Sequence, residues 1–164
     1  MVNLDGTREW FAEEMRRQMK NKGVSLTDVS KDCNIKRDKL NNYMQQRSLP
    51  GPDILIILAS YFECYVNDFL DFDEPDDDEL LYYEPDELFE DEDELMTHIS
   101  NRMHRIMEDR CIDITELSEL TGYNAHTIRH WLGMHSRRPG LFRTSDLLVL
   151  CSALDCTPSD LLGY

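Results

Sequence analysis

The sequence of 164 residues has no apolar run long enough to cross a bilayer. Its longest run, Ile54–Ala59, is far shorter than the roughly 20 residues that a membrane helix needs. The N-terminus lacks the basic start and apolar stretch of a secretory signal peptide. The five cysteines are odd in number and include no Cys-x-x-Cys pair, which argues for reduced thiols rather than a disulfide framework. These absences predict a cytoplasmic protein without membrane contact.

Motifs for catalysis and metal binding are also lacking. The sequence has no glycine-rich phosphate loop, no nucleophile elbow and no convincing pair of catalytic carboxylates. His126 and His130 have the i, i+4 spacing of two metal ligands on a helix, but no zinc-finger pair of Cys or His completes the set. We therefore expect no enzyme, no cofactor and no metal site.

Basic residues are missing from the middle of the chain. Overall, 17 Lys and Arg stand against 33 Asp and Glu, a net charge of −16. Residues 71–94 hold 15 acidic residues and no basic one, whereas the segments on either side are close to neutral. The low isoelectric point thus belongs to the middle segment. A uniformly basic nucleic-acid coat protein is excluded, but a site-specific nucleic-acid binder is not.

A repeat is present in the two near-neutral segments. At an offset of 88 residues apolar positions coincide, as Phe11 does with Ile99. After residue 43 the offset becomes 92, which pairs Leu58 with Leu150. One structural unit therefore occurs twice. We predict units over 1–70 and 95–164, joined by an acidic linker over 71–94.

Helical spacing of apolar residues and cap signals predict five helices in each unit, and no stretch alternates like a strand. The fold class is therefore all-α. Ser25 and Asp113 each stand three residues before a carboxylate, which is a start signal for the second helix. Asn34 and Gly122 tolerate the left-handed backbone of the turn that follows.

The third helices are expected over 36–45 and 124–132, and the fourth after the Pro-Asp and Ser-Asp signals at 52–53 and 145–146. Asn124 is a suitable N-cap for its third helix, whereas Lys36 is not.

The segments KGVSLTDVSKDCNIKRDKLNNYMQQ and RCIDITELSELTGYNAHTIRHWLGM, with LASYFECYVNDFL and LCSALDCTPSDLL after them, carry a family resemblance. This pattern resembles the lambda-repressor-like (Cro/cI, XRE-type) helix-turn-helix family, in two tandem copies. The resemblance implies two five-helix domains. In each, the second and third helices would present the third, the recognition helix, to the major groove of double-stranded DNA.

In the first copy, the resemblance makes Arg37, Asp38 and Asn42 candidates for reading base edges. Arg can bridge two acceptors of guanine, and Asn can pair with adenine. The other exposed polar residues of this helix and its loop are Lys36, Lys39, Asn41 and Arg47. The three cations among them would hold phosphates. The alternative is that this surface is only the solvated face of a small helix.

In the second copy, the third helix and the loop after it supply a further set of DNA candidates. Exposed polar residues on the helix are Asn124, His126, Thr127, Arg129 and His130, and the loop adds His135, Arg137, Arg138 and Arg143. A short loop with basic and no acidic residues after a recognition helix is suited to phosphate contact. The alternative is an ordinary exposed loop.

The acidic segment has three interpretations. It could be a solvated linker kept extended by its own charge. Its leucines and aromatic residues could instead dock on a domain face. Or its carboxylates could imitate the charge of DNA and cover the recognition surfaces or a partner's basic site.

The sequence thus predicts a bacterial or phage-type transcriptional regulator, such as a repressor, with two helix-turn-helix heads on double-stranded DNA. The alternative is a protein-interaction module or acidic DNA-mimic inhibitor on the same scaffold, with residues 71–94 binding a basic protein partner. Either form could also pair as a homodimer.

Overall fold

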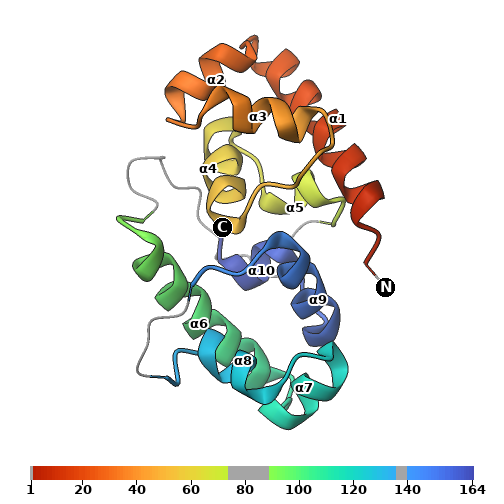
Figure 1. Ribbon diagram of the computed structural model, residues 1–164, viewed down its shortest axis with the longest axis vertical. Helices are drawn as coiled ribbons and strands as arrows, with labels where there is room; N and C mark the ends of the chain where they lie inside the picture. Colours follow the sequence, from red (N-terminus) through yellow and green to blue (C-terminus); the bar gives the residue numbers. More distant parts are fainter. Residues whose placement is uncertain (1, 74–88, 136–139) are drawn as a thin grey trace.

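The computed structural model describes residues 2–73, 89–135 and 140–164, which form helices and loops without a strand (Figure 1). No helix within these residues is long and apolar enough to span a bilayer. The helices are α1 (Leu4–Lys22), α2 (Leu26–Asp32), α3 (Arg37–Met44), α4 (Pro52–Phe62), α5 (Val66–Leu70), α6 (Glu92–Asp109), α7 (Ile114–Thr121), α8 (Ala125–Trp131), α9 (Thr144–Leu154) and α10 (Pro158–Leu162). The expected all-helical class is confirmed.

Most contacts between helices lie within one half of the chain. In the first half, α1 packs against α3, α4 and α5, and α2 packs against α3. In the second half, α6 packs against α10, α7 against α8 and α9, and α9 against α10. Phe11 of α1 is fully buried, with its ring 6.1 Å from that of Tyr43 and 5.4 Å from that of Phe69. Helices α5 and α10 also pack against each other and join the two halves (Figure 1).

The cap residues begin the short helices as the sequence indicates. Ser25 and Asp28 form a complete capping box, and the hydrogen bonds from the Ser25 hydroxyl and backbone N–H lower the pKa of the Asp28 carboxyl. Asp113 accepts a hydrogen bond from the Glu116 N–H at 2.9 Å. Asn124 caps α8, whereas Lys36 makes no side-chain cap bond at the start of α3.

Left-handed backbone recurs at equivalent positions in the two halves. Asn34 and Gly122, 88 residues apart, have φ of 52° and 76° in the turns after α2 and α7. Glu63 and Asp155, 92 residues apart, have φ of 56° and 49° after α4 and α9. Since such a backbone is uncommon for residues other than glycine, its recurrence supports a common plan for the two halves.

The acidic segment 71–94 does not stay irregular to its end. Asp91 is the N-cap of α6, and Glu92 lies in the first turn of this helix. Carboxylates are favourable there because the N-terminal N–H groups of a helix carry partial positive charge. Residues 74–88, which make up most of the predicted linker, lie outside the described residues.

Candidate nucleic-acid interface

The turn between α7 and α8 is closed by one side chain. The Ser118 hydroxyl on α7 donates a 2.6 Å hydrogen bond to the carbonyl of Tyr123, just before α8 begins. Between them, Gly122 takes the left-handed conformation that reverses the chain. Leu117, Ile128 and Trp131 are buried, so they hold the inner faces of the two helices together. The opposite face of α8 therefore remains on the surface, and the short turn before it is held by the hydrogen bond from Ser118 to Tyr123.

The turn between α2 and α3 is closed by the same bond. The Ser30 hydroxyl donates to the carbonyl of Ile35, also at 2.6 Å, and both residues lie 88 positions before their counterparts. Val29, Leu40 and Tyr43 are buried on the inner faces of α2 and α3.

A second recurring bond holds the far end of each third helix. The Arg16 guanidinium on α1 donates to the Met44 carbonyl at 3.0 Å. Its counterpart His104 on α6 lies 3.2 Å from the Leu132 carbonyl through Nε2. These contacts satisfy carbonyls that a helix leaves unpaired at its C-terminus. Sequence reasoning missed them, although the 88-residue offset aligns a polar residue at this position in both copies.

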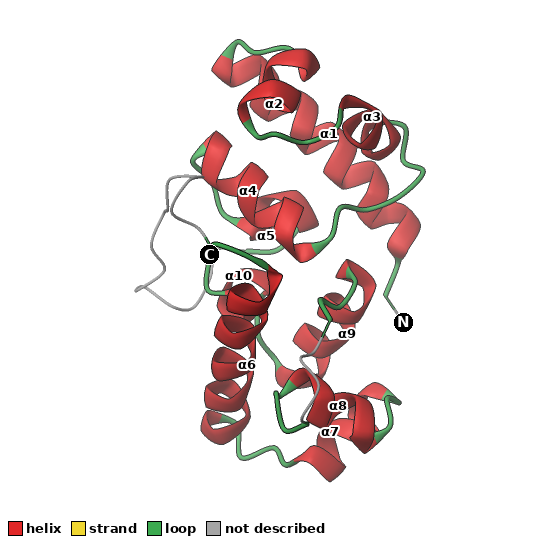
Figure 2. Cartoon of the chain, turned by 60° about the vertical axis from the view of Figure 1, so that its left-hand side comes forward, coloured by secondary structure: helices red, strands yellow, loops and turns green. Residues whose placement is uncertain are grey.

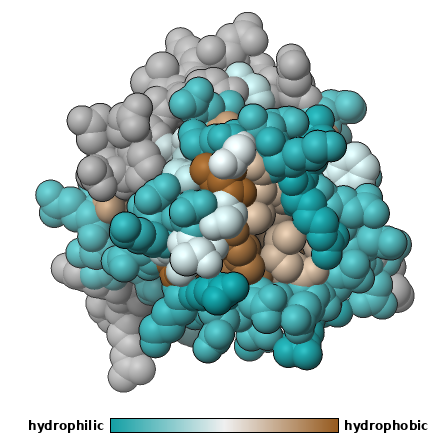
Figure 3. Space-filling view, turned by 90° about the horizontal axis from the view of Figure 1, so that it is seen from above, coloured by the Kyte–Doolittle hydropathy of each residue, from teal (hydrophilic) through white to brown (hydrophobic). Residues whose placement is uncertain are grey.

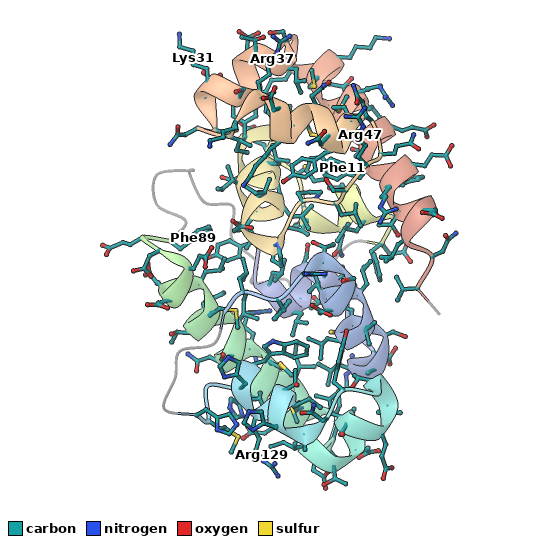
Figure 4. All side chains as sticks on the ribbon, viewed as in Figure 1. Phe11, Lys31, Arg37, Arg47, Phe89 and Arg129 are labelled. Atoms are coloured by element: carbon teal, nitrogen blue, oxygen red, sulfur yellow. The ribbon has the colours of Figure 1, made fainter. Side chains whose placement is uncertain are left out.

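Most of the predicted DNA-facing residues on α3 and in its loop lie on the surface. The exposed ones are Lys36, Arg37, Asp38, Lys39, Asn41 and Arg47. Asn42 is only half-buried, and its amide oxygen lies 3.4 Å from Nη1 of Arg47 as hydrogen-bond acceptor. Figure 4 shows Arg37 pointing outward at one end of the molecule.

The residues predicted on α8 divide by exposure. Asn124, His126 and Arg129 are exposed, whereas Thr127 and His130 are half-buried. The Asn124 amide oxygen accepts hydrogen bonds from both the backbone N–H and the hydroxyl of Thr127. That oxygen is committed to the cap, so only the amide NH2 group of Asn124 could serve a nucleic acid. Arg129 points outward at the opposite end of the molecule from Arg37 (Figure 4).

The loop after α8 is described only in part. Arg137 and Arg138 lie outside the described residues. His135 is half-buried, and its ring centroid lies 4.4 Å from that of His126 and 6.1 Å from that of His130. Over residues 2–73, 89–135 and 140–164, no group of three His, Cys, Asp or Glu side chains is arranged to hold a metal ion.

A cleft of about 770 Å³ lies where the loops after α3 and α8 approach each other. Arg8, Arg47 and Arg143 line this cleft together with the carboxylates Asp53 and Glu92. Sequence reasoning placed Arg47 and Arg143 in separate heads, but the fold brings them to one cavity.

Helices α3 and α8 lie on the same side of the molecule. Figure 1 places them toward the viewer in the upper and lower halves, and after the 60° turn of Figure 2 both lie to the right of α5, α6 and α10. Figure 3 views the end formed by the first half, where hydrophilic side chains surround an apolar strip. Both third helices are therefore accessible from one direction.

Comparison with known proteins gives a match, which lies in the second half of the chain. Residues 102–164 match the family model described as a Cro/C1-type HTH DNA-binding domain. This match contains α7, the turn at Gly122 and α8. No curated protein and no solved structure matches the chain.

Proposed function

We propose that this protein is a transcriptional regulator that binds double-stranded DNA at specific sequences, with α8 as a recognition helix. The observation that carries the proposal is the Cro/C1-type HTH domain at residues 102–164, in which α8 projects polar side chains from the braced turn at Gly122. A helix presented in this way fits the major groove, where each base pair offers a distinct pattern of donors and acceptors.

Helix α3 acts as a second recognition helix. The support is local: the Ser30 hydroxyl bond, the left-handed Asn34 and the Arg16 contact to Met44 all have counterparts at the same offset in the second half. These contacts favour two tandem five-helix units, which the sequence repeat also predicts.

The side chains of the two helices have separate roles. Arg37 and Arg129 are suited to read guanine, because an Arg side chain can form two hydrogen bonds to the edge of that base. Both side chains are exposed, and they lie at opposite ends of the molecule. Lys36, Lys39 and Arg47 would hold phosphates and set the register of the protein on the duplex. Asn42 can pair with adenine through its amide, whose oxygen accepts one 3.4 Å hydrogen bond from Arg47 and retains a second lone pair.

The experiment selects duplexes from a random-sequence DNA pool and measures their affinity over a salt series. We expect a defined site and a linear fall of log affinity with log salt concentration, because phosphate contacts release counterions. Arg129→Ala should lose about 1–3 kcal/mol of binding free energy if it contacts a base. Arg105→Ala on α6 is the matched control. Arg105 is exposed and lies outside α3 and α8, and its Nε is 4.0 Å from a carboxylate oxygen of Asp109 on the same helix, so its loss should leave DNA binding unchanged.

The net charge of −16 supports a second candidate function, an interaction module that offers its acidic segment to a basic protein. The same assay separates the two. If no duplex binds above the level of random DNA at low salt, DNA reading is wrong and the interaction module replaces it.

A further inference from the structure

The two halves meet at equivalent residues. The Asn67 backbone N–H in the first turn of α5 donates to the Ser159 hydroxyl at 3.2 Å. The Ser159 N–H in the first turn of α10 donates to the Asn67 amide oxygen at 2.8 Å. Residues 67 and 159 differ by 92, the offset of the repeat at this point. Each side chain thus caps the other helix, whose first N–H groups have no partner within the helix.

This contact has the form of an isologous interface, in which one patch meets its own copy across a two-fold axis. Both residues are inaccessible, with Asn67 1% and Ser159 0% exposed. A further hydrogen bond, from the Thr144 hydroxyl to the Pro50 carbonyl, joins the start of α9 to the loop after α3. Buried polar groups with paired partners fix one arrangement, because separation or sliding would leave them unsatisfied.

The contact between the halves bears on the recognition helices. With α5 packed against α10, helices α3 and α8 lie on one side of the molecule (Figures 1 and 2), and the loops after them share the cleft lined by Arg47 and Arg143. Two helices held in this way can enter successive major grooves on one face of a duplex, with the arginines of the cleft over the phosphates between them.

The two helices nevertheless offer different chemistry at equivalent positions. At the offset of 88, Arg37 corresponds to Ala125 and Asn41 corresponds to Arg129. The hydrogen-bonding groups that each helix can present to base edges therefore differ.

From this arrangement, and building on the proposed DNA binding, we propose that a single chain binds a single asymmetric DNA site. The site has two unlike half-sites on one face of the duplex. The α5–α10 contact holds the two helices at a fixed spacing and takes the place of a dimer interface between two chains.

The test uses a duplex selected from a random pool, with the full-length protein. Native mass spectrometry should give one chain per duplex. Footprinting on this duplex locates the two half-sites. Inserting 5 bp between them rotates one half-site to the opposite face of the duplex. Inserting 10 bp restores the face but adds one helical turn to the spacing. A rigid chain should bind both altered duplexes roughly 10²-fold more weakly, because two linked contacts are reduced to one. Two chains on a palindrome, or equal affinity for all three duplexes, would overturn the proposal.

A variant tests the role of the contact between the halves. Ser159→Arg places a long side chain at a fully buried position, whereas Ser152→Arg adds the same charge at an exposed position of α9. We expect Ser159→Arg to bind the native and the lengthened duplexes within about twofold of each other, as a flexibly tethered pair would. Ser152→Arg should keep the full spacing penalty. Circular dichroism checks folding; if Ser159→Arg does not fold, the insertion series with the native chain decides alone.

The experiments distinguish an error in the fixed single-chain arrangement from an error in the proposed DNA binding. A protein that binds no selected duplex refutes DNA reading itself. A protein that binds a specific duplex but with two chains, or without regard to spacing, refutes only the fixed single-chain arrangement.

Discussion

The Tyr123 hydroxyl donates a 2.6 Å hydrogen bond to a carboxylate oxygen of Asp146, which joins the turn before α8 to the first turn of α9. Burial, together with this carboxylate, raises the pKa of Tyr123 to about 12. The Tyr123 ring also packs edge-on against Trp131, with centroids 5.0 Å apart. A contact between distant segments therefore holds the N-terminal end of α8, the candidate recognition helix.

This bond predicts sensitivity to alkali. An unfolded Tyr loses its proton near pH 10, whereas folded Tyr123 keeps it to about pH 12. The folded state binds more protons between these values, so stability is complete below about pH 10 and falls as the pH rises through this window. Tyr123→Phe should cost about 1 kcal/mol at neutral pH and flatten the alkaline decline.

Urea unfolding at a series of pH values measures this effect. Tyr61→Phe is a matched comparison, because burial and the Asp32 carboxylate likewise raise the pKa of Tyr61 to about 12 in the first half of the chain. An unchanged alkaline decline in the Tyr123 variant would show that the folded protein does not raise the pKa of Tyr123.

Arg37 provides a test of α3. Arg37→Ala should relax the base preference at one position of the selected site and cost about 1–3 kcal/mol of binding free energy. Arg37→Lys is the matched variant, since it keeps the charge but loses the fork geometry that bridges two guanine acceptors. We expect it to retain binding to random DNA and lose the base preference. Identical affinity and site preference in Arg37→Ala would remove α3 from the interface.

The chain should separate into two folded pieces. Cleavage between residues 78 and 84 is expected to leave two helical fragments, because the helices on each side of this segment bury their own apolar residues, such as Phe11 and Ile99. Each fragment should melt below the intact protein, since it loses the capping contact between Asn67 and Ser159. Far-UV circular dichroism during heating follows both. Loss of helical signal in both fragments would mean that the halves depend on one shared core.

The acidic segment is expected to compete with DNA for the basic residues beside it. Changing six carboxylates to their amides should tighten DNA binding, most clearly at low salt where charge is least screened. The six are Asp76, Asp77, Asp78, Asp91, Glu92 and Asp93. Fluorescence anisotropy over a salt series measures the effect, and equal affinities throughout would refute competition.

The structure supplies a control for this experiment. Asp91 caps α6, and Glu92 and Asp93 lie in its first turn, so their amides also alter a helix N-terminus. Asn is an effective N-cap, so Asp91→Asn should keep the helix start. A variant with only these last three changes separates the effect on α6 from the effect on DNA binding.

Local features of the fold could be predicted because each depends on neighbours in sequence. Ser25, Asp113 and Asn124 cap the helices that they were expected to begin, and Asn34 and Gly122 adopt the left-handed turn. Cap and turn geometry involves only three or four residues, so residue type and spacing suffice to indicate it. The starts of the fourth helices were less exact: α9 begins at Thr144, before the Ser-Asp signal.

Contacts between distant residues could not be predicted in the same way. Arg16 and His104 look like ordinary polar residues on the outer face of a first helix, yet each reaches a carbonyl at the end of a third helix. Asn42 was expected to be exposed but lies half-buried beside Arg47. Such contacts depend on how helices cross, which side-chain packing decides and which periodicity does not reveal.

The helical class and the distribution of charge could be read from the sequence alone, and the sequence pattern predicts that one unit occurs twice, because periodicity, caps and composition depend on neighbouring residues. The contact that joins α5 to α10, and the placement of α3 and α8 on the same side, arise only when the helices pack together. Asn67 and Ser159, 92 residues apart, satisfy each other's backbone only after both halves have folded. No local signal could indicate this pairing, because its two hydrogen bonds join polar groups that meet only in the complete fold and would be buried without partners if the halves were misaligned.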